Sequence, residues 1–82
     1  MAETNRAAEM MVFVRVVEAG GFAAAARASR LTPSAVSKLV SRLEGRLGTR
    51  LINRTTRSLG VTPEGAAFYG RSVRILADID EA

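Results

Sequence analysis

The sequence predicts a small, mainly α-helical domain with a two-stranded β-hairpin before its last helix. Three observations predict this fold class. Helical segments are separated by a glycine pair or begin at Thr-Pro pairs, which are typical helix ends and starts. Between residues 51 and 61 the apolar pattern shortens to two runs around a polar, basic tip, which is typical of a hairpin. A length of 82 residues allows one domain of this kind.

The first two helices are expected to pack closely on each other. The first begins after Asn5, a favourable N-cap, and ends at the glycine pair 20–21. The second covers residues 22–29, and its small inner side chains allow a close helix crossing. The residues expected inside are Met10, Phe13, Val14 and Val17 on one side of the first helix, Val12 and Val16 on its second side, and Phe22, Ala25, Ala26 and Ser29 on the second helix.

The third helix is expected to begin at the N-cap Thr32, with Pro33 in its first turn, and to end at Gly48. Gly45 inside this helix costs about 1 kcal/mol relative to alanine, and a close contact is one explanation for it. The apolar face of the helix is expected to comprise Val36, Leu39, Val40, Leu43 and Leu47.

The hairpin is expected at residues 51–53 and 58–61, and it needs the helices for stability. A second start signal, Thr62-Pro63-Glu64, then opens a last helix that runs toward the chain end. We therefore expect two parts, residues 1–61 and residues 62–82.

Composition argues against an enzyme, a metal site or a cofactor. The chain contains no Cys and no His, so thiolate or imidazole ligands and a Ser–His pair are absent. Glu44 has no second carboxylate near it in the sequence with which to share acid–base work. Neither a membrane span nor an export signal is recognisable, which favours a cytoplasmic protein.

The positive charge is concentrated in the middle of the chain. Eight Lys or Arg residues and one acid lie between Arg27 and Arg57, so this segment carries +7 while the rest carries −3. Such a segment is typical of a surface that binds a polyanion, although a solvated face of a basic protein is the alternative. On the third helix, Ser34, Ser37 and Ser41 lie opposite the apolar face and are flanked by Lys38 and Arg42. Short hydroxyl side chains with cations at their edge suit a helix that enters the major groove of DNA.

Residues 22–38 read FAAAARASRLTPSAVSK, and this run resembles the helix-turn-helix of LysR-type bacterial transcriptional regulators. The resemblance implies a winged helix-turn-helix with a three-helix core and a two-stranded wing, followed by a long linker helix through which two chains pair. Later segments resemble the family's winged domain in order and spacing: Leu43-Glu44, Leu47-Gly48, 50–57, Leu59 and 62–65.

The resemblance implies a recognition helix over 33–47 in the major groove and a wing over 51–61 at the minor groove. Arg57 is expected in the minor groove, and Thr32 and Thr56 are expected at phosphates. Together with the face of the third helix, the resemblance gives these expected DNA contacts: Arg30, Thr32, Pro33, Ser34, Ala35, Ser37, Lys38, Ser41, Arg42, Arg54, Thr56 and Arg57.

Four further residues carry specific expectations. Ser29 and Ile52 stand where the family usually has Leu and Phe, so we expect a thinner core there. Lys38 stands where Arg is frequent, which weakens a bidentate guanine contact. Glu44 is expected to pair with an arginine such as Arg50 and to hold the wing against the helix; the other candidate partner is Arg54.

The apolar residues of the last helix cover an arc of roughly 160°, whereas docking on one core needs ~100°. We expect one flank to pack on the domain and the other on the same helix of a second chain; packing of both flanks within one domain is the alternative. The expected dimer residues form one flank of Phe68, Ile75 and Ile79, another of Tyr69, Val73 and Leu76, and the intervening Ser72.

These expectations add up to a dimeric, sequence-specific regulator of transcription that binds an interrupted inverted repeat in double-stranded DNA on the nucleoid. One alternative is a non-specific architectural nucleic-acid-binding module, and another is a helical protein-interaction module. In full-length relatives of the family an effector-binding domain follows the linker helix. The chain, which ends at Ala82, is expected to be the DNA-binding portion alone.

Overall fold

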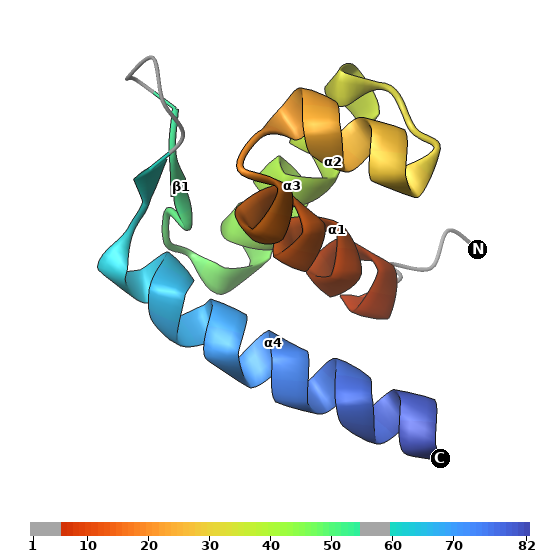
Figure 1. Cartoon of the computed structure of the whole chain (residues 1–82). Helices are drawn as coiled ribbons and strands as arrows, with labels where there is room; N and C mark the ends of the chain where they lie inside the picture. The colour runs from red at the N-terminus through yellow and green to blue at the C-terminus, as the bar shows by residue number, and fades with distance from the viewer. Residues whose placement is uncertain (1–5, 55–59) are drawn as a thin grey trace, which may run out of the picture.

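A computed structural model describes residues 6–54 and 60–82 of the chain. The helices are α1 (Arg6–Ala19), α2 (Phe22–Ser29), α3 (Pro33–Leu47) and α4 (Pro63–Glu81), and the strands are β1 (Ile52–Asn53) and β2 (Gly60–Val61). The first three helices form a cluster, the hairpin stands at one end of it, and α4 runs past α1 on the side away from α2 (Figure 1). The predicted mainly α-helical fold class is confirmed.

The two strands pair antiparallel, with Ile52 opposite Val61 and Asn53 opposite Gly60. The hairpin tip, including the expected DNA contacts Thr56 and Arg57, lies outside the described residues, as does the expected N-cap Asn5. Over residues 6–54 and 60–82, no helix combines the length and the apolar character needed to cross a membrane.

Helix ends follow the capping chemistry of the sequence. The Thr32 hydroxyl oxygen accepts a hydrogen bond from the Ala35 N–H at 3.1 Å, and α3 ends at Gly48, whose φ of 71° is left-handed. Helix α2 ends at Ser29, as expected, but the form of its end was not anticipated, since Arg30 adopts a left-handed φ of 57° there. Only glycine enters this region without strain, so an arginine at this position costs roughly 1–2 kcal/mol.

The core lies where α1, α2 and α3 meet the first strand. Two sides of α1 are covered, as expected: Phe13 and Val14 of the first side and Val12 and Val16 of the second are buried, whereas Met10 and Val17 are only partly buried. Leu47 was expected in the core and is 41% exposed, because it is the last residue of α3 and lies beyond the packed turns. The buried apolar residues that pack into one core cluster are Val12, Phe13, Val16, Ala25, Ala26, Val36, Val40, Leu43, Leu51 and Ile52.

Ser29 leaves a gap, in agreement with the expectation of a thinner core at this position. Its hydroxyl is buried without a hydrogen-bond partner among the described residues. It lines a hollow of about 290 Å³ together with Met11, Val12 and Arg15. Ile52, by contrast, is fully buried in the core.

Candidate nucleic-acid interface

The side of α3 opposite the core carries the serine and cationic side chains predicted for it. Val36, Val40 and Leu43 are buried, and their burial fixes the rotation of the helix about its axis. The opposite side is open to solvent, with Ser37 partly buried and its neighbours exposed. These exposed neighbours are Ser34, Lys38, Ser41 and Arg42.

The N-terminal end of α3 is also open. Arg30, Thr32 and Pro33 are exposed, and Ala35 is partly buried. The first N–H groups of the helix and its positive dipole end favour an anion here. The Thr32 oxygen caps the helix, which leaves its hydroxyl hydrogen as a donor toward the same side. This end of the helix is suited to a phosphate group.

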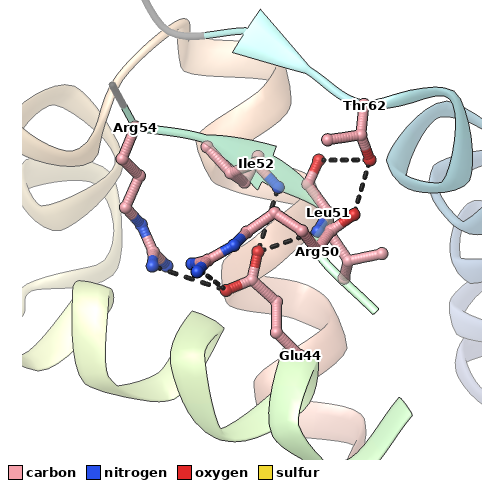
Figure 2. Close-up of polar contacts among 6 residues, drawn as sticks. All are labelled: Glu44, Arg50, Leu51, Ile52, Arg54 and Thr62. Carbon is pink, nitrogen blue, oxygen red and sulfur yellow. Dashed lines mark hydrogen bonds and ion pairs between the residues drawn. The ribbon is translucent and has the colours of Figure 1, made fainter. Parts of the chain in front are cut away.

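Glu44 joins α3 to the wing, as predicted, and it pairs with both candidate arginines (Figure 2). Its Oε1 atom lies 3.4 Å from Nη1 of Arg50 and 3.4 Å from Nη1 of Arg54. Its Oε2 atom accepts hydrogen bonds from the backbone N–H groups of Leu51 at 2.8 Å and Ile52 at 3.0 Å. A carboxylate that is only 7% exposed therefore has two backbone donors and two guanidinium partners.

Arg54, expected to contact DNA, is directed toward the inside of the domain. Its side chain is 26% exposed, against 64% for Arg50. Its guanidinium carbon lies 5.2 Å from the ring centroid of Phe22, at the start of α2. Sequence reasoning missed this cation–π contact, because no periodicity relates a strand end to a helix 32 positions earlier in the chain.

A second joint connects the wing to α4. The Thr62 hydroxyl donates to the carbonyl oxygen of Arg50 at 2.6 Å and accepts from the Gly65 N–H at 2.9 Å. The Thr62 N–H donates to the Leu51 carbonyl at 3.0 Å. A β-carbon on Gly65 would lie 2.2 Å from that same carbonyl oxygen, so only glycine fits at this position. By contrast, a β-carbon on Gly45 would meet no atom within 4 Å, so a close contact within the chain does not explain that glycine.

Sequence reasoning also missed Glu9, which is 1% exposed and forms an ion pair with Arg46 at 2.6 Å. The pair ties α1 to the last turns of α3 and thereby helps to fix the position of α3. The sequence did contain a signal for its burial. Glu9 lies three residues before Val12 and four before Phe13, so it shares the buried face of α1 with them.

The expected dimer residues of α4 fall into two groups. Phe68 packs on Phe13 with ring centroids 5.8 Å apart, and the Tyr69 hydroxyl donates to Glu18 at 2.8 Å. That hydrogen bond, with burial and the charge of Glu18, raises the pKa of Tyr69 above its ordinary value. Leu76 is also partly buried. Ser72 is fully buried within its own chain, so its assignment to the dimer interface is wrong.

Three of the expected dimer residues remain open: Val73 and Ile75 are each 39% exposed, and Ile79 is 55% exposed. The two flanks therefore divide differently from the expectation. One member of the first flank and two of the second lie partly against the domain, namely Phe68, Tyr69 and Leu76. The domain covers the middle of the apolar arc and leaves Val73 and Ile75 exposed at its two edges, whereas Ile79 is exposed in the last turn of α4.

The helical cluster, the capped helix-turn-helix and the hairpin define a winged helix-turn-helix domain. The family model described as "Bacterial regulatory helix-turn-helix protein, lysR family" matches residues 7–66. The chain belongs to this family.

Relatives and solved structures agree with this assignment. The HTH-type transcriptional regulator CrgA of Neisseria meningitidis is 50% identical over 74 residues, which are 90% of this chain and 25% of CrgA. The HTH-type transcriptional activator AaeR of Escherichia coli is 42% identical over 77 residues, 94% of this chain and 25% of AaeR. The chain thus spans about a quarter of the length of these curated relatives. Both are named as transcriptional regulators, in agreement with the prediction that the chain is not an enzyme.

The crystal structure of the BenM_DBD/catB site 1 DNA complex is similar as well. Its TM-score is 0.88 at 32% identity, and the match covers 92% of this chain and 83% of that chain.

Proposed function

We propose that this chain is the DNA-binding part of a LysR-type transcriptional regulator and that it recognises double-stranded DNA by sequence. The observation that carries the proposal is the exposed side of α3, where Ser34, Ser37 and Ser41 are flanked by Lys38 and Arg42. Serine side chains let the helix backbone approach base edges, and the cations meet the flanking phosphates. The similar BenM structure is named as a DNA complex, which supports the same role here.

In the proposed complex, helix 33–47 enters the major groove and the wing, residues 51–61, meets the minor groove. The base-reading positions are Ser34, Ala35, Ser37, Lys38 and Ser41. Phosphate contacts come from Arg30, Thr32 and Arg42 around the start and edge of α3, and from Thr56 of the wing, while the Pro33 ring makes an apolar contact at the start of the helix. Arg57, also in the wing, enters the minor groove.

We also propose that two chains pair through α4, the helix of the linker segment 62–82. The exposed Val73, Ile75 and Ile79 support a second contact surface on this helix. A two-fold dimer places two recognition helices on one side of the duplex, and its target is an interrupted inverted repeat. In the full-length protein an effector-binding domain follows the linker, and the protein acts on the nucleoid in the cytoplasm.

The test of sequence-specific binding is selection of bound duplexes from a random pool, followed by competition with random duplex. We expect the selected duplex to compete at least about a hundredfold better, within the range for specific DNA-binding proteins. Ser37→Phe should abolish this preference without unfolding the chain, because it places a ring against the base edges. Ala67→Phe, on an exposed position of α4, is the matched control and should keep the preference. Equal competition by both duplexes would favour a non-specific architectural module instead.

The test of the dimer is sedimentation of the chain at tens of micromolar, with and without the selected duplex. Ile79→Asp should weaken self-association at least tenfold, because it places a charge on the exposed apolar edge. Ala67→Asp adds the same charge to an exposed position outside that edge and should leave self-association unchanged. A wild-type chain that sediments as a monomer under both conditions would contradict the proposal.

A further inference from the structure

We propose that Arg54 is a positioning residue, which sets the angle of the wing to the recognition helix through Glu44 and does not itself contact DNA. The inference rests on the proposed function, since the wing must meet the groove next to the one that α3 reads. It assigns to Arg54 a role different from the DNA contact expected from its place in the wing.

The first step is the geometry of the Glu44 carboxylate (Figure 2). Glu44 projects from the last turns of α3, and both of its oxygens are directed toward the first strand. Its Oε2 atom holds the N–H groups of Leu51 and Ile52, at 2.8 and 3.0 Å. These bonds fix where the wing leaves the core, because both amides are buried with their residues. They fix a point but leave rotation about that point to other contacts.

The second step is the path of the Arg54 side chain. It begins immediately after β1, passes Glu44 of α3 at 3.4 Å and ends over the Phe22 ring of α2 at 5.2 Å. One planar guanidinium therefore touches two helices of the cluster from the far end of the strand. Contacts with both helices restrict the rotation that the Glu44 hydrogen bonds allow, so they set the wing angle.

The third step is the contrast with Arg50. Both arginines lie 3.4 Å from the same Glu44 oxygen, but Arg50 is 64% exposed and Arg54 only 26%. Two guanidinium nitrogens of Arg54, Nε and Nη2, are buried and have no hydrogen-bond partner among the described residues. For Arg54 to reach a phosphate, it would have to leave both the ring and the buried carboxylate. Arg50 provides a matched control, since its removal breaks an equal ion pair without releasing α2.

The decisive measurement is the salt dependence of binding to the selected duplex. The salt slope is the steepness with which the logarithm of the binding constant falls as the logarithm of the salt concentration rises. Removal of a phosphate contact lowers this slope by about one per chain. Loss of positioning instead lowers the affinity at every salt concentration and leaves the slope unchanged. We expect Arg54→Gln to weaken binding roughly tenfold, the size of effect seen when a coupled element is loosened, with the slope of the wild type. Arg50→Gln should weaken binding less than Arg54→Gln. Phe22→Leu should add little further loss in the Arg54→Gln background.

A second readout follows the Arg54 Nε–Hε resonance by NMR, which burial protects from exchange with water. It should keep its shift when the duplex binds. A fall of the slope by about one for Arg54→Gln, or a large shift of this resonance on binding, would overturn the inference. If Arg54→Gln does not fold, Arg54→Lys keeps the charge and loses the planar stacking, and it should show the same loss of affinity without loss of slope. Should the wild type show no preference for any duplex, the proposed function fails, while the resonance in the free protein still tests the contact with Phe22.

Discussion

Replacement of Gly65 by alanine tests how tightly α4 is joined to the wing. The added β-carbon would lie 2.2 Å from the Leu51 carbonyl oxygen and 2.9 Å from a methyl group of Val61. An ordinary contact between such atoms is about 3.4 Å or more, so the backbone must move by roughly 1 Å. Leu51 is fully buried and its carbonyl accepts the Thr62 N–H at 3.0 Å, so the carbonyl cannot move without disturbing that bond.

The magnitude follows from these contacts. Overpacking of this kind costs about 1–3 kcal/mol, and a weakened hydrogen bond adds about 1 kcal/mol. The better helix propensity of alanine offsets up to about 1 kcal/mol of this destabilisation. We therefore expect Gly65→Ala to lower the free energy of unfolding by roughly 2–3 kcal/mol. For a domain of this size that is a fall in Tm of roughly 10–20 °C.

The assay is thermal and urea unfolding followed by circular dichroism at one fixed protein concentration. Gly70→Ala is the matched control, because a β-carbon there meets no atom within 4 Å in the same helix. It should raise the stability by about 0.5–1 kcal/mol. A Gly65→Ala protein as stable as Gly70→Ala would refute the close packing of α4 on the Leu51 carbonyl.

Three further predictions follow. Tyr69 is the only tyrosine of a chain without tryptophan, so absorbance at alkaline pH reports its ionisation directly. Its midpoint should lie above 10.0 and fall in Glu18→Gln, because the hydrogen bond to Glu18 raises its pKa. Since the pKa of Tyr69 is higher in the folded state than in the unfolded state, the hydrogen bond to Glu18 contributes fully to stability below pH 10, and this contribution is lost as the pH rises through the folded-state pKa. A titration midpoint that does not move in Glu18→Gln would contradict the contact. Ser29→Leu should stabilise the fold by about 0.5–2 kcal/mol in urea unfolding by filling the hollow beside α1, and Ser29→Ala, which removes the hydroxyl without filling it, should gain less. Equal gains would show that the hollow is not filled. Arg30→Gly should raise Tm by a few degrees, because glycine relieves the left-handed strain at about 1 kcal/mol, yet weaken DNA binding with a salt slope lower by about one per chain. An unchanged slope would remove Arg30 from the DNA contacts.

Local chemistry made much of this fold predictable. The start of α3 at Pro33 and its end at the cap Gly48 depend on capping atoms within four residues, so the sequence predicts both. The start of α4 after Thr62 follows the same logic. The pairing of Glu44 with Arg50 or Arg54 was predictable because one acid stands alone among many cations.

Features that depend on tertiary packing were not predictable in the same way. Met10 and Val17 are only partly buried while Val12 and Val16 are buried, because α1 is apolar on several sides and only the neighbouring helices decide its rotation. Leu47 has the right spacing for the core but lies past its edge. The inward course of Arg54 depends on Phe22, which is distant in the sequence. Spacing predicts which face a residue shares, and it does not predict how far the core extends along that face.

The pairing of Glu9 with Arg46, and of Glu44 with Arg50 and Arg54, distributes charge unevenly along α3. Both buried acids neutralise arginines near its C-terminal end. Over the described residues no acid forms an ion pair with the cations beside its N-terminal end and along its exposed side, namely Arg27, Arg30, Lys38 and Arg42. Positive charge that no ion pair neutralises therefore lies beside the amide end and along the exposed side of α3, where it adds to the helix dipole. In the proposed complex, this charge attracts the duplex toward that side of α3 before close contact is made.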